Sequence, residues 1–178
     1  TSVGYYEFTG LPAGSYKLKF SPLPAYLVSD KDQGSDESQD SDIDPTSKDL
    51  AKIAQMTSKV IKMFGMQPVM AMISFSNFGS SNNERASKVR DAVAFLHRHY
   101  PDMLVDGELQ TDFALNDEML RERFPFSKLV GKKVNALIYP NLESANISYK
   151  LLKEMYKAES IGPIIMGLNK PVHLLQLG

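Results

Sequence analysis

Carboxylate and amide side chains cluster in a short stretch near the middle of the chain, at residues 104–112. Within it Asp106, Glu108 and Gln110 recur at every second position after an apolar Leu-Val pair. Alternate residues of an extended segment lie on one side, so we expect these three side chains to converge. Such a group could bind a metal or transfer protons. We favour the simpler interpretation, in which they hydrogen-bond a strand end to neighbouring helix termini.

A second polar stretch follows an apolar run at residues 69–75 and precedes a helical pattern. It contains Ser76, Asn77, Gly79 and Ser80. Its amides and hydroxyls could hold a phosphate, because the unpaired N–H groups and the dipole of a helix N-terminus favour an anion. An ordinary polar loop with capping side chains has the same composition, and the lysine of a full phosphate-loop signature is missing. Both interpretations stay open.

A third polar turn follows the apolar run at residues 134–139 and includes Asn141 and Asn146. In an open α/β sheet, ligands bind beyond the carboxyl ends of the strands. Each of the three turns comes directly after a strand-like run. We therefore expect them to line one ligand-binding edge.

The elements that must position these turns alternate between helix and strand. Apolar spacing predicts helices at residues 46–64, 83–99, 116–123 and 144–156, and strands at 69–75, from 104, 134–139, 162–166 and 171–177. Strands separated by helices imply right-handed crossovers and a parallel sheet. The predicted fold class is α/β, with a mainly parallel sheet and helices on both faces.

The first 45 residues have a different character. Residues 1–28 hold alternating aromatic runs around a Leu-Pro-Ala-Gly turn, which predicts a β-hairpin, and residues 29–45 form an acidic stretch typical of a solvated linker. Closely spaced carboxylates also suit calcium, and Asp36, Asp40 and Asp42 are the candidate ligands. Their spacing does not match an EF-hand loop.

Composition limits the function further. The chain has 178 residues, 43% of them hydrophobic, a net charge of −1 and no cysteine. The balanced charge gives no reason to expect nucleic acid or a membrane as partner, and the absence of cysteine excludes disulfides and thiol chemistry. No apolar run reaches the length of a membrane-spanning helix. We expect a soluble protein, and both ends read as cut, as in a fragment.

Two family resemblances divide the chain at about residue 45. The pattern Tyr-Glu-Phe-Thr-Gly-Leu-Pro-Ala-Gly-Ser-Tyr at residues 6–16, with the acidic segment that follows, resembles a serine-aspartate repeat adhesin B-type domain. That family consists of calcium-binding β-sandwich modules of bacterial surface proteins. The resemblance implies that residues 1–28 are the remnant of such a module.

The remainder, residues 46–178, carries Ser-Phe-Ser-Asn-Phe-Gly-Ser at 74–80, Asp-Gly-Glu-Leu-Gln at 106–110 and Asn-Ile-Ser-Tyr-Lys at 146–150. This set resembles the phosphate acetyl/butyryl transferases, and in particular the C-terminal domain of bacterial hybrid NADP-dependent malic enzymes. The resemblance implies an incomplete α/β lobe beside an acetyl-CoA and phosphate cleft, and it adds Lys150 to the candidate ligand-binding residues.

One departure from the transferase pattern bears on activity. Where the transferases carry a catalytic Ser-Arg-Gly, this chain reads Gln176-Leu177-Gly178. Glutamine lacks the hydroxyl, and leucine cannot replace a guanidinium that neutralises phosphate charge. The resemblance then implies a cytoplasmic regulatory module that senses acetyl-CoA and self-associates in its parent, without acetyl transfer and without a cofactor of its own. Acetyl transfer and calcium binding by residues 1–44 are the alternatives.

The junction itself is informative. The segment Ile43-Asp44-Pro45-Thr46 suits both the end of the adhesin-like part and the start of the transferase-like part. A cell-surface calcium module and a cytoplasmic metabolic domain belong to different compartments. We infer that the two parts were joined artificially.

Overall fold

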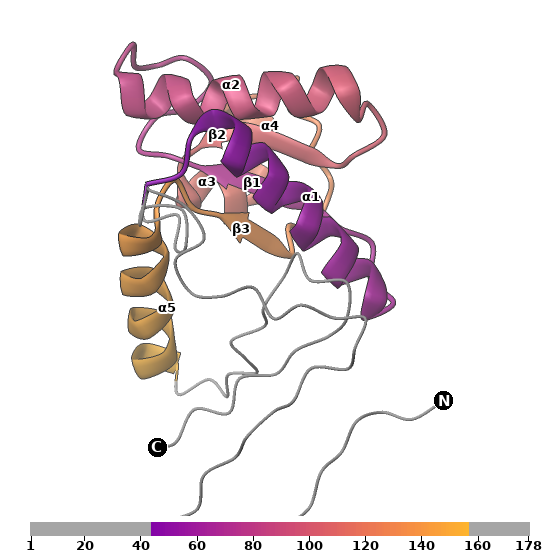
Figure 1. Cartoon of the computed structure of the whole chain (residues 1–178), viewed down its shortest axis with the longest axis vertical. Coiled ribbons are helices and arrows are strands. Elements are labelled where there is room, and N and C mark those ends of the chain that lie inside the picture. The colour runs from indigo at the N-terminus through magenta and orange to yellow at the C-terminus, as the bar shows by residue number, and fades with distance from the viewer. Residues whose placement is uncertain (1–43, 157–178) are drawn as a thin grey trace, which may run out of the picture. The chain divides into compact units, whose positions relative to one another are not determined.

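The computed structural model describes residues 44–156 (Figure 1). The elements in chain order are α1 (Ser47–Met63), β1 (Met70–Ile73), α2 (Glu84–His99), β2 (Val105–Leu109), α3 (Thr111–Leu115), α4 (Asp117–Arg123), β3 (Ala136–Ile138) and α5 (Leu142–Tyr156). The predicted alternation of helix and strand is confirmed, and α3 is an addition to it. The hairpin expected at 1–28, nearly all of the acidic linker and the strands expected at 162–166 and 171–177 lie outside the described residues.

Local capping explains where the two long helices begin. Thr46 and Asp49 form a reciprocal capping box at the start of α1, in which each side chain accepts from the other residue's backbone N–H. The Asn83 side chain accepts from the N–H of Arg85 at the start of α2. Both starts agree with the boundaries expected from the sequence.

The sheet is parallel, with strand order β2-β1-β3. The central strand β1 pairs Met70 with Val105 of β2 on one side and with Ala136 of β3 on the other. All four residues of β1 are buried. This pattern is typical of a parallel strand covered on both faces, which explains why the sequence there is continuously apolar rather than alternating.

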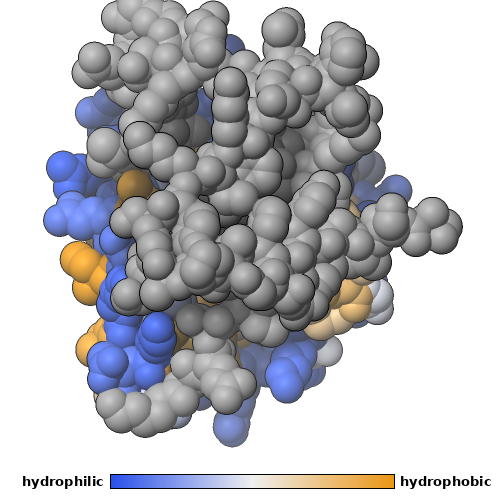
Figure 2. Space-filling model, turned by 60° about the horizontal axis from the view of Figure 1, so that its bottom comes forward, coloured by the Kyte–Doolittle hydropathy of each residue, from blue (hydrophilic) through white to orange (hydrophobic). Residues whose placement is uncertain are grey.

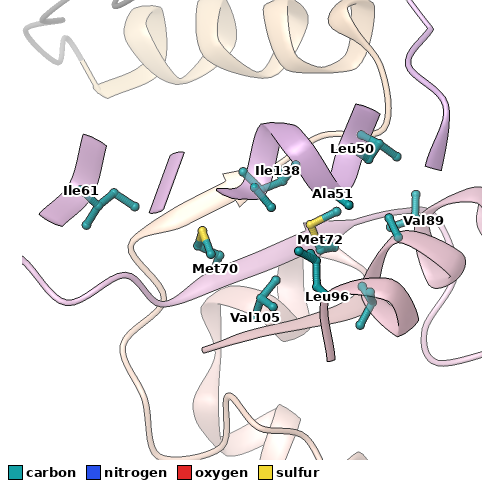
Figure 3. Close-up of a cluster of buried hydrophobic side chains, with 12 residues drawn as sticks. Leu50, Ala51, Ile61, Met70, Met72, Val89, Leu96, Val105 and Ile138 are labelled. Carbon is teal, nitrogen blue, oxygen red and sulfur yellow. The ribbon is translucent and has the colours of Figure 1, made fainter. Parts of the chain in front are cut away.

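Two hydrophobic clusters cover the two faces of the sheet. Met70 and Met72 point from β1 into the first cluster, which contains residues of α1 and α2 (Figure 3). Ala71 and Ile73 belong to the second cluster, together with Leu120 of α4 and residues of α3 and the following loop. The helices on both faces that the sequence predicts are therefore present.

The connections that follow β1 and β2 lead to opposite faces of the sheet. The chain leaves β1 toward α2, which packs on the first face, whereas it leaves β2 toward α3 and α4, which pack on the second. In open α/β sheets, ligands bind beyond the carboxyl ends of strands at the point where neighbouring connections diverge in this way. Residues 74–82 and 108–112 occupy that point.

Helix α5 differs from the other long helices. None of its side chains is buried, and Ile147, Leu151 and Met155 are 61, 57 and 67% exposed.

On the face of the molecule shown in Figure 2, hydrophobic residues lie at the surface among hydrophilic ones. In residues 44–156, no helix combines the length and apolar character needed to cross a lipid bilayer.

Candidate functional site

The buried carboxylate of Glu108 is the centre of the loop that joins β1 to α2. Its Oε1 atom accepts hydrogen bonds from Ser76 Oγ at 2.8 Å, from the Gly79 N–H at 2.8 Å and from Arg90 Nη1 at 3.0 Å. The glutamate side chain is fully buried, whereas that of Arg90 is one-third exposed. A single carboxylate oxygen thus connects β2 to two residues of the loop, Ser76 and Gly79, and to Arg90 of α2.

A chain of hydroxyls leads from Glu108 toward the surface. Ser76 Oγ accepts from the Ser81 N–H at 3.0 Å and lies 3.0 Å from Ser80 Oγ. Since Ser76 donates its single hydroxyl proton to Glu108, Ser80 must donate to Ser76. Ser80 Oγ also accepts from the Asn77 N–H at 3.0 Å. The Ser80 residue is exposed, so it is the solvent-facing end of this chain.

Asn77 and Gln110 join the carboxyl ends of β1 and β2. Asn77 Nδ2 donates to Gln110 Oε1, and the Gln110 N–H donates to Asn77 Oδ1, both at 2.7 Å. Gln110 Nε2 donates in turn to the carbonyl of Phe75 at 2.7 Å. The side chain of Asn77 thus binds the backbone of the loop after β2, and the side chain of Gln110 binds the backbone of the loop after β1.

The loop amides are already engaged. The backbone N–H groups of residues 76–81 donate to acceptors within the protein, including the Glu108 carbonyl and carboxylate and the Ser76 and Ser80 hydroxyls. An anion would have to displace these acceptors, and a buried carboxylate already occupies the centre of the loop. The geometry therefore gives no support to a phosphate held by these six amides.

Asp106 belongs to a different network. Its Oδ2 accepts from Ser127 Oγ at 2.8 Å and from the Lys128 N–H at 2.7 Å. Its Oδ1 accepts from the Gly107 N–H at 3.0 Å and lies 3.7 Å from His97 Nε2. Asp106 thus fastens the loop that follows α4, and the convergence with Glu108 expected from alternate spacing does not occur.

An irregularity in β2 explains the separation. Met72 pairs with Gly107, but the next residue of β1, Ile73, pairs with Leu109, so Glu108 is the extra residue of a bulge. A bulge turns the side chains that follow it relative to those before it. The rule of two-residue alternation therefore fails between Asp106 and Glu108.

The third turn contributes residues that contact neither network. Asn141 Oδ1 accepts from the Ser144 N–H at 2.8 Å, at the start of α5. Asn146 is exposed on α5, and Lys150 is exposed with its Nζ 5.6 Å from the centre of the Tyr149 ring. The structure brings together Ser76, Asn77, Gly79, Ser80, Glu108 and Gln110, and it places Asp106, Asn141, Asn146 and Lys150 elsewhere.

Metal binding is not supported in the described part of the chain. Across residues 44–156, no group of three or more His, Asp or Glu side chains is arranged to hold a metal ion. The candidate calcium ligands Asp36, Asp40 and Asp42 lie outside these residues. His97 Nε2 donates to the Val105 carbonyl oxygen at 2.8 Å, and His99 stacks on Phe95, so the two histidines have separate structural roles.

Two side chains of the networks, Arg90 and Ser127, are missing from the sequence-based predictions. Arg90 lies beside Val89 at the border of the apolar stripe of α2, a position from which a cation can reach the sheet edge. Ser127 comes directly after Phe126, and Phe124 lies two residues before Phe126. Two aromatic residues so close together could have indicated that this loop is packed and ordered. Both rings contact Phe78, at centroid distances of 4.9 and 5.0 Å.

Two family models match overlapping parts of the chain. A family model described as phosphate acetyl/butaryl transferase matches residues 40–178, and one described as an SdrD B-like domain matches residues 1–63. The NADP-dependent malic enzyme of Salmonella typhimurium is 43% identical over 133 residues, which are 74% of this chain and 17% of the enzyme. The phosphate acetyltransferase of Clostridium acetobutylicum is 41% identical over 135 residues, 75% of this chain and 40% of that protein.

Solved structures show the same similarity. A phosphotransacetylase from Streptococcus pyogenes matches with a TM-score of 0.71 and 41% identity, over 76% of this chain and 41% of that one. EutD phosphotransacetylase from Staphylococcus aureus matches with a TM-score of 0.69 and 35% identity, over 74% of this chain and 41% of that one. The chain spans less than half the length of each of these relatives. Its described fold and the match over residues 40–178 show that the chain belongs to the phosphate acetyl/butaryl transferase family.

Proposed function

We propose that residues 46–178 form a domain that binds acetyl-CoA as a regulatory effector and does not transfer its acetyl group. The observation that supports the absence of acetyl transfer is the position of the two carboxylates of the candidate site. Asp106 and Glu108 are 5 and 0% exposed, and both hold loops through hydrogen bonds. A general base must reach the reacting group, and neither of these carboxylates is open to one.

The sequence at the end of the chain also supports binding without transfer. The resemblance to the transferases places Gln176 and Leu177 at the positions of the family's Ser and Arg. The similarity to malic enzymes, of which this chain spans 17%, is consistent with a domain attached to a separate catalytic part. Self-association in such a parent is part of the same proposal.

Calorimetry with acetyl-CoA tests the binding step. Lys150 is suited to bind a phosphate of the effector, because its ammonium is exposed and its only described contact is the Tyr149 ring. We expect the full chain to bind acetyl-CoA and the variant Lys150→Gln to bind it about tenfold more weakly, as for the loss of one ion pair at a ligand. Lys153→Gln, on the same helix, is the matched control. Absence of binding by the unchanged chain would reject the proposal.

Acetyl transfer is the second candidate, favoured by the similarity to phosphate acetyltransferases. Incubation of the chain with acetyl phosphate and CoA, followed by measurement of the thioester, separates the two. We expect no thioester above the level without protein. Turnover that is lost in Ser80→Ala would replace the regulatory proposal with the enzymatic one.

Calcium binding by residues 1–44 is the third candidate, and the match to the SdrD B-like model over residues 1–63 favours it. A calcium titration of the full chain is the direct test. Heat of binding that is absent in a variant with Asp36, Asp40 and Asp42 changed to Asn would support it. The acetyl-CoA measurement is independent of that result, because it concerns residues 46–178.

A further inference from the structure

A hollow of about 380 Å³ lies beside α3 and α4, and none of the residues that bind Glu108 through hydrogen bonds lines it. Its lining residues are Phe113, Met119, Glu122, Arg123 and Phe124. Pockets for small ligands have volumes of about 300–1,000 Å³, so this hollow suits a small ligand or one part of a larger one. None of the five residues belongs to the ligand-binding set predicted from the sequence.

The walls of the hollow are aromatic and apolar. Phe113 and Phe124 are half-buried, with ring centroids 5.1 Å apart and an angle of 69° between the ring planes. The thioether side chain of Met119 is half-buried beside them. The Phe124 ring also contacts the Phe78 ring, with 4.9 Å between the ring centroids. Rigid aromatic faces and a polarizable sulfur favour a flat aromatic ring over a flexible aliphatic chain.

The rim of the hollow carries one cation and one carboxylate, on Arg123 and Glu122. Both residues are exposed, and within residues 44–156 neither side chain forms a hydrogen bond or an ion pair. Arg121 on the same helix differs, because its Nη2 donates to Asp117 Oδ2 at 2.7 Å. A free guanidinium binds phosphate through paired N–H donors, and a free carboxylate accepts from an amino group.

We propose that this hollow binds an adenine mononucleotide. The purine ring packs against Phe113 and Phe124, Arg123 binds the phosphate, and Glu122 accepts a hydrogen bond from the exocyclic amino group. A purine suits the site better than a pyrimidine, because its two fused rings cover more of the aromatic wall. The site uses residues separate from those of the proposed acetyl-CoA function and does not depend on it.

Titration of the full chain with AMP tests the phosphate contact. We expect saturable binding, weakened about tenfold in Arg123→Gln and unchanged in the control Arg121→Gln, which removes the same charge two residues away. Adenosine, which lacks the phosphate, is expected to bind the unchanged chain and Arg123→Gln equally. Both arginines are exposed, so neither change disturbs the core.

A comparison of AMP with IMP tests the contact of Glu122. IMP carries a carbonyl in place of the amino group, and a carboxylate repels it. The chain should therefore prefer AMP, and Glu122→Gln should remove the preference. The proposal is overturned if AMP shows no saturable binding up to about 10 mM, if the two arginine variants weaken binding equally, or if AMP and IMP bind alike. Acetylpantetheine, which lacks the nucleotide, tests the acetyl-CoA proposal without involving this hollow.

Discussion

Asn77 and Gln110 are joined by two hydrogen bonds of 2.7 Å, one in each direction, across the carboxyl ends of two neighbouring parallel strands. One bond links the two side chains, and the other links the Gln110 backbone to the Asn77 side chain. The pair ties the loop after β1 to the loop after β2, so the arrangement of the candidate site depends on it.

Asn77→Ala removes both bonds and leaves the Gln110 N–H without its acceptor. We expect the free energy of unfolding to fall by about 1–3 kcal/mol, because an unsatisfied and partly buried donor is costly. Urea denaturation measures the change. Asn82→Ala, in the same loop but exposed, is the control and should change stability by less than about 0.5 kcal/mol. Equal denaturation midpoints for the two variants would show that the pair does not hold the strand ends.

Glu108→Gln removes the charge that faces Arg90 at 3.0 Å. Breaking a buried ion pair costs about 3–5 kcal/mol, and one-third exposure of the arginine places this case at the lower end. The control is Lys88→Met, which breaks the ion pair with Asp44, a carboxylate 72% exposed, and should cost less than about 1 kcal/mol. Denaturation at neutral pH compares them. Similar losses for both variants would contradict the role assigned to Glu108.

Much of the fold could be predicted from the sequence, because local signals determine it. Apolar spacing and the capping residues Thr46 and Asn83 place α1 and α2, and the continuous apolar run before Ser74 predicts a strand buried on both faces. Helix α3 could not be predicted. It has five residues and no side-chain cap, so neither periodicity nor a capping signal marks it.

The candidate site could be predicted only in part. Ser76, Gly79 and Glu108 do come together, because the carboxyl ends of parallel strands meet at one edge. Asp106 does not join them, since the bulge at Glu108 changes the side on which the neighbouring side chains lie, and sequence spacing carries no sign of it. Arg90 reaches the site from a helix, through a contact that only the tertiary structure creates.

Gly107→Ala tests the close approach of β2 to β1. Gly107 has a φ of 145°, and a Cβ atom there would lie 2.5 Å from the backbone oxygen of Met72. We expect a loss of more than about 3 kcal/mol, because the clash is with backbone of the central strand. Gly65→Ala is the control: its φ is 73°, with nothing within 4 Å of the added atom, so about 1 kcal/mol of conformational strain is expected. Thermal unfolding that ranks the two in the opposite order would contradict this account of the sheet.

Asp49 links the stability of α1 to pH. Hydrogen bonds from the Thr46 hydroxyl and backbone N–H hold the pKa of Asp49 below its ordinary value of 3.8. A depressed pKa in the folded state stabilises the protein at pH values above 3.8, and this contribution is lost as the pH falls through the folded-state pKa. Asp49→Asn should therefore cost about 0.5–1 kcal/mol at pH 6, as for a helix cap, and progressively less below pH 3.8.

Denaturation of both proteins between pH 6 and pH 2 measures the effect. Thr46→Ala provides the control, because it removes the side chain that contributes most to the low pKa of Asp49. In the Thr46→Ala background, Asp49→Asn should show a smaller change with pH than in the unchanged chain. If the cost of Asp49→Asn is the same at every pH, the capping box holds the start of α1 without using the charge of the aspartate.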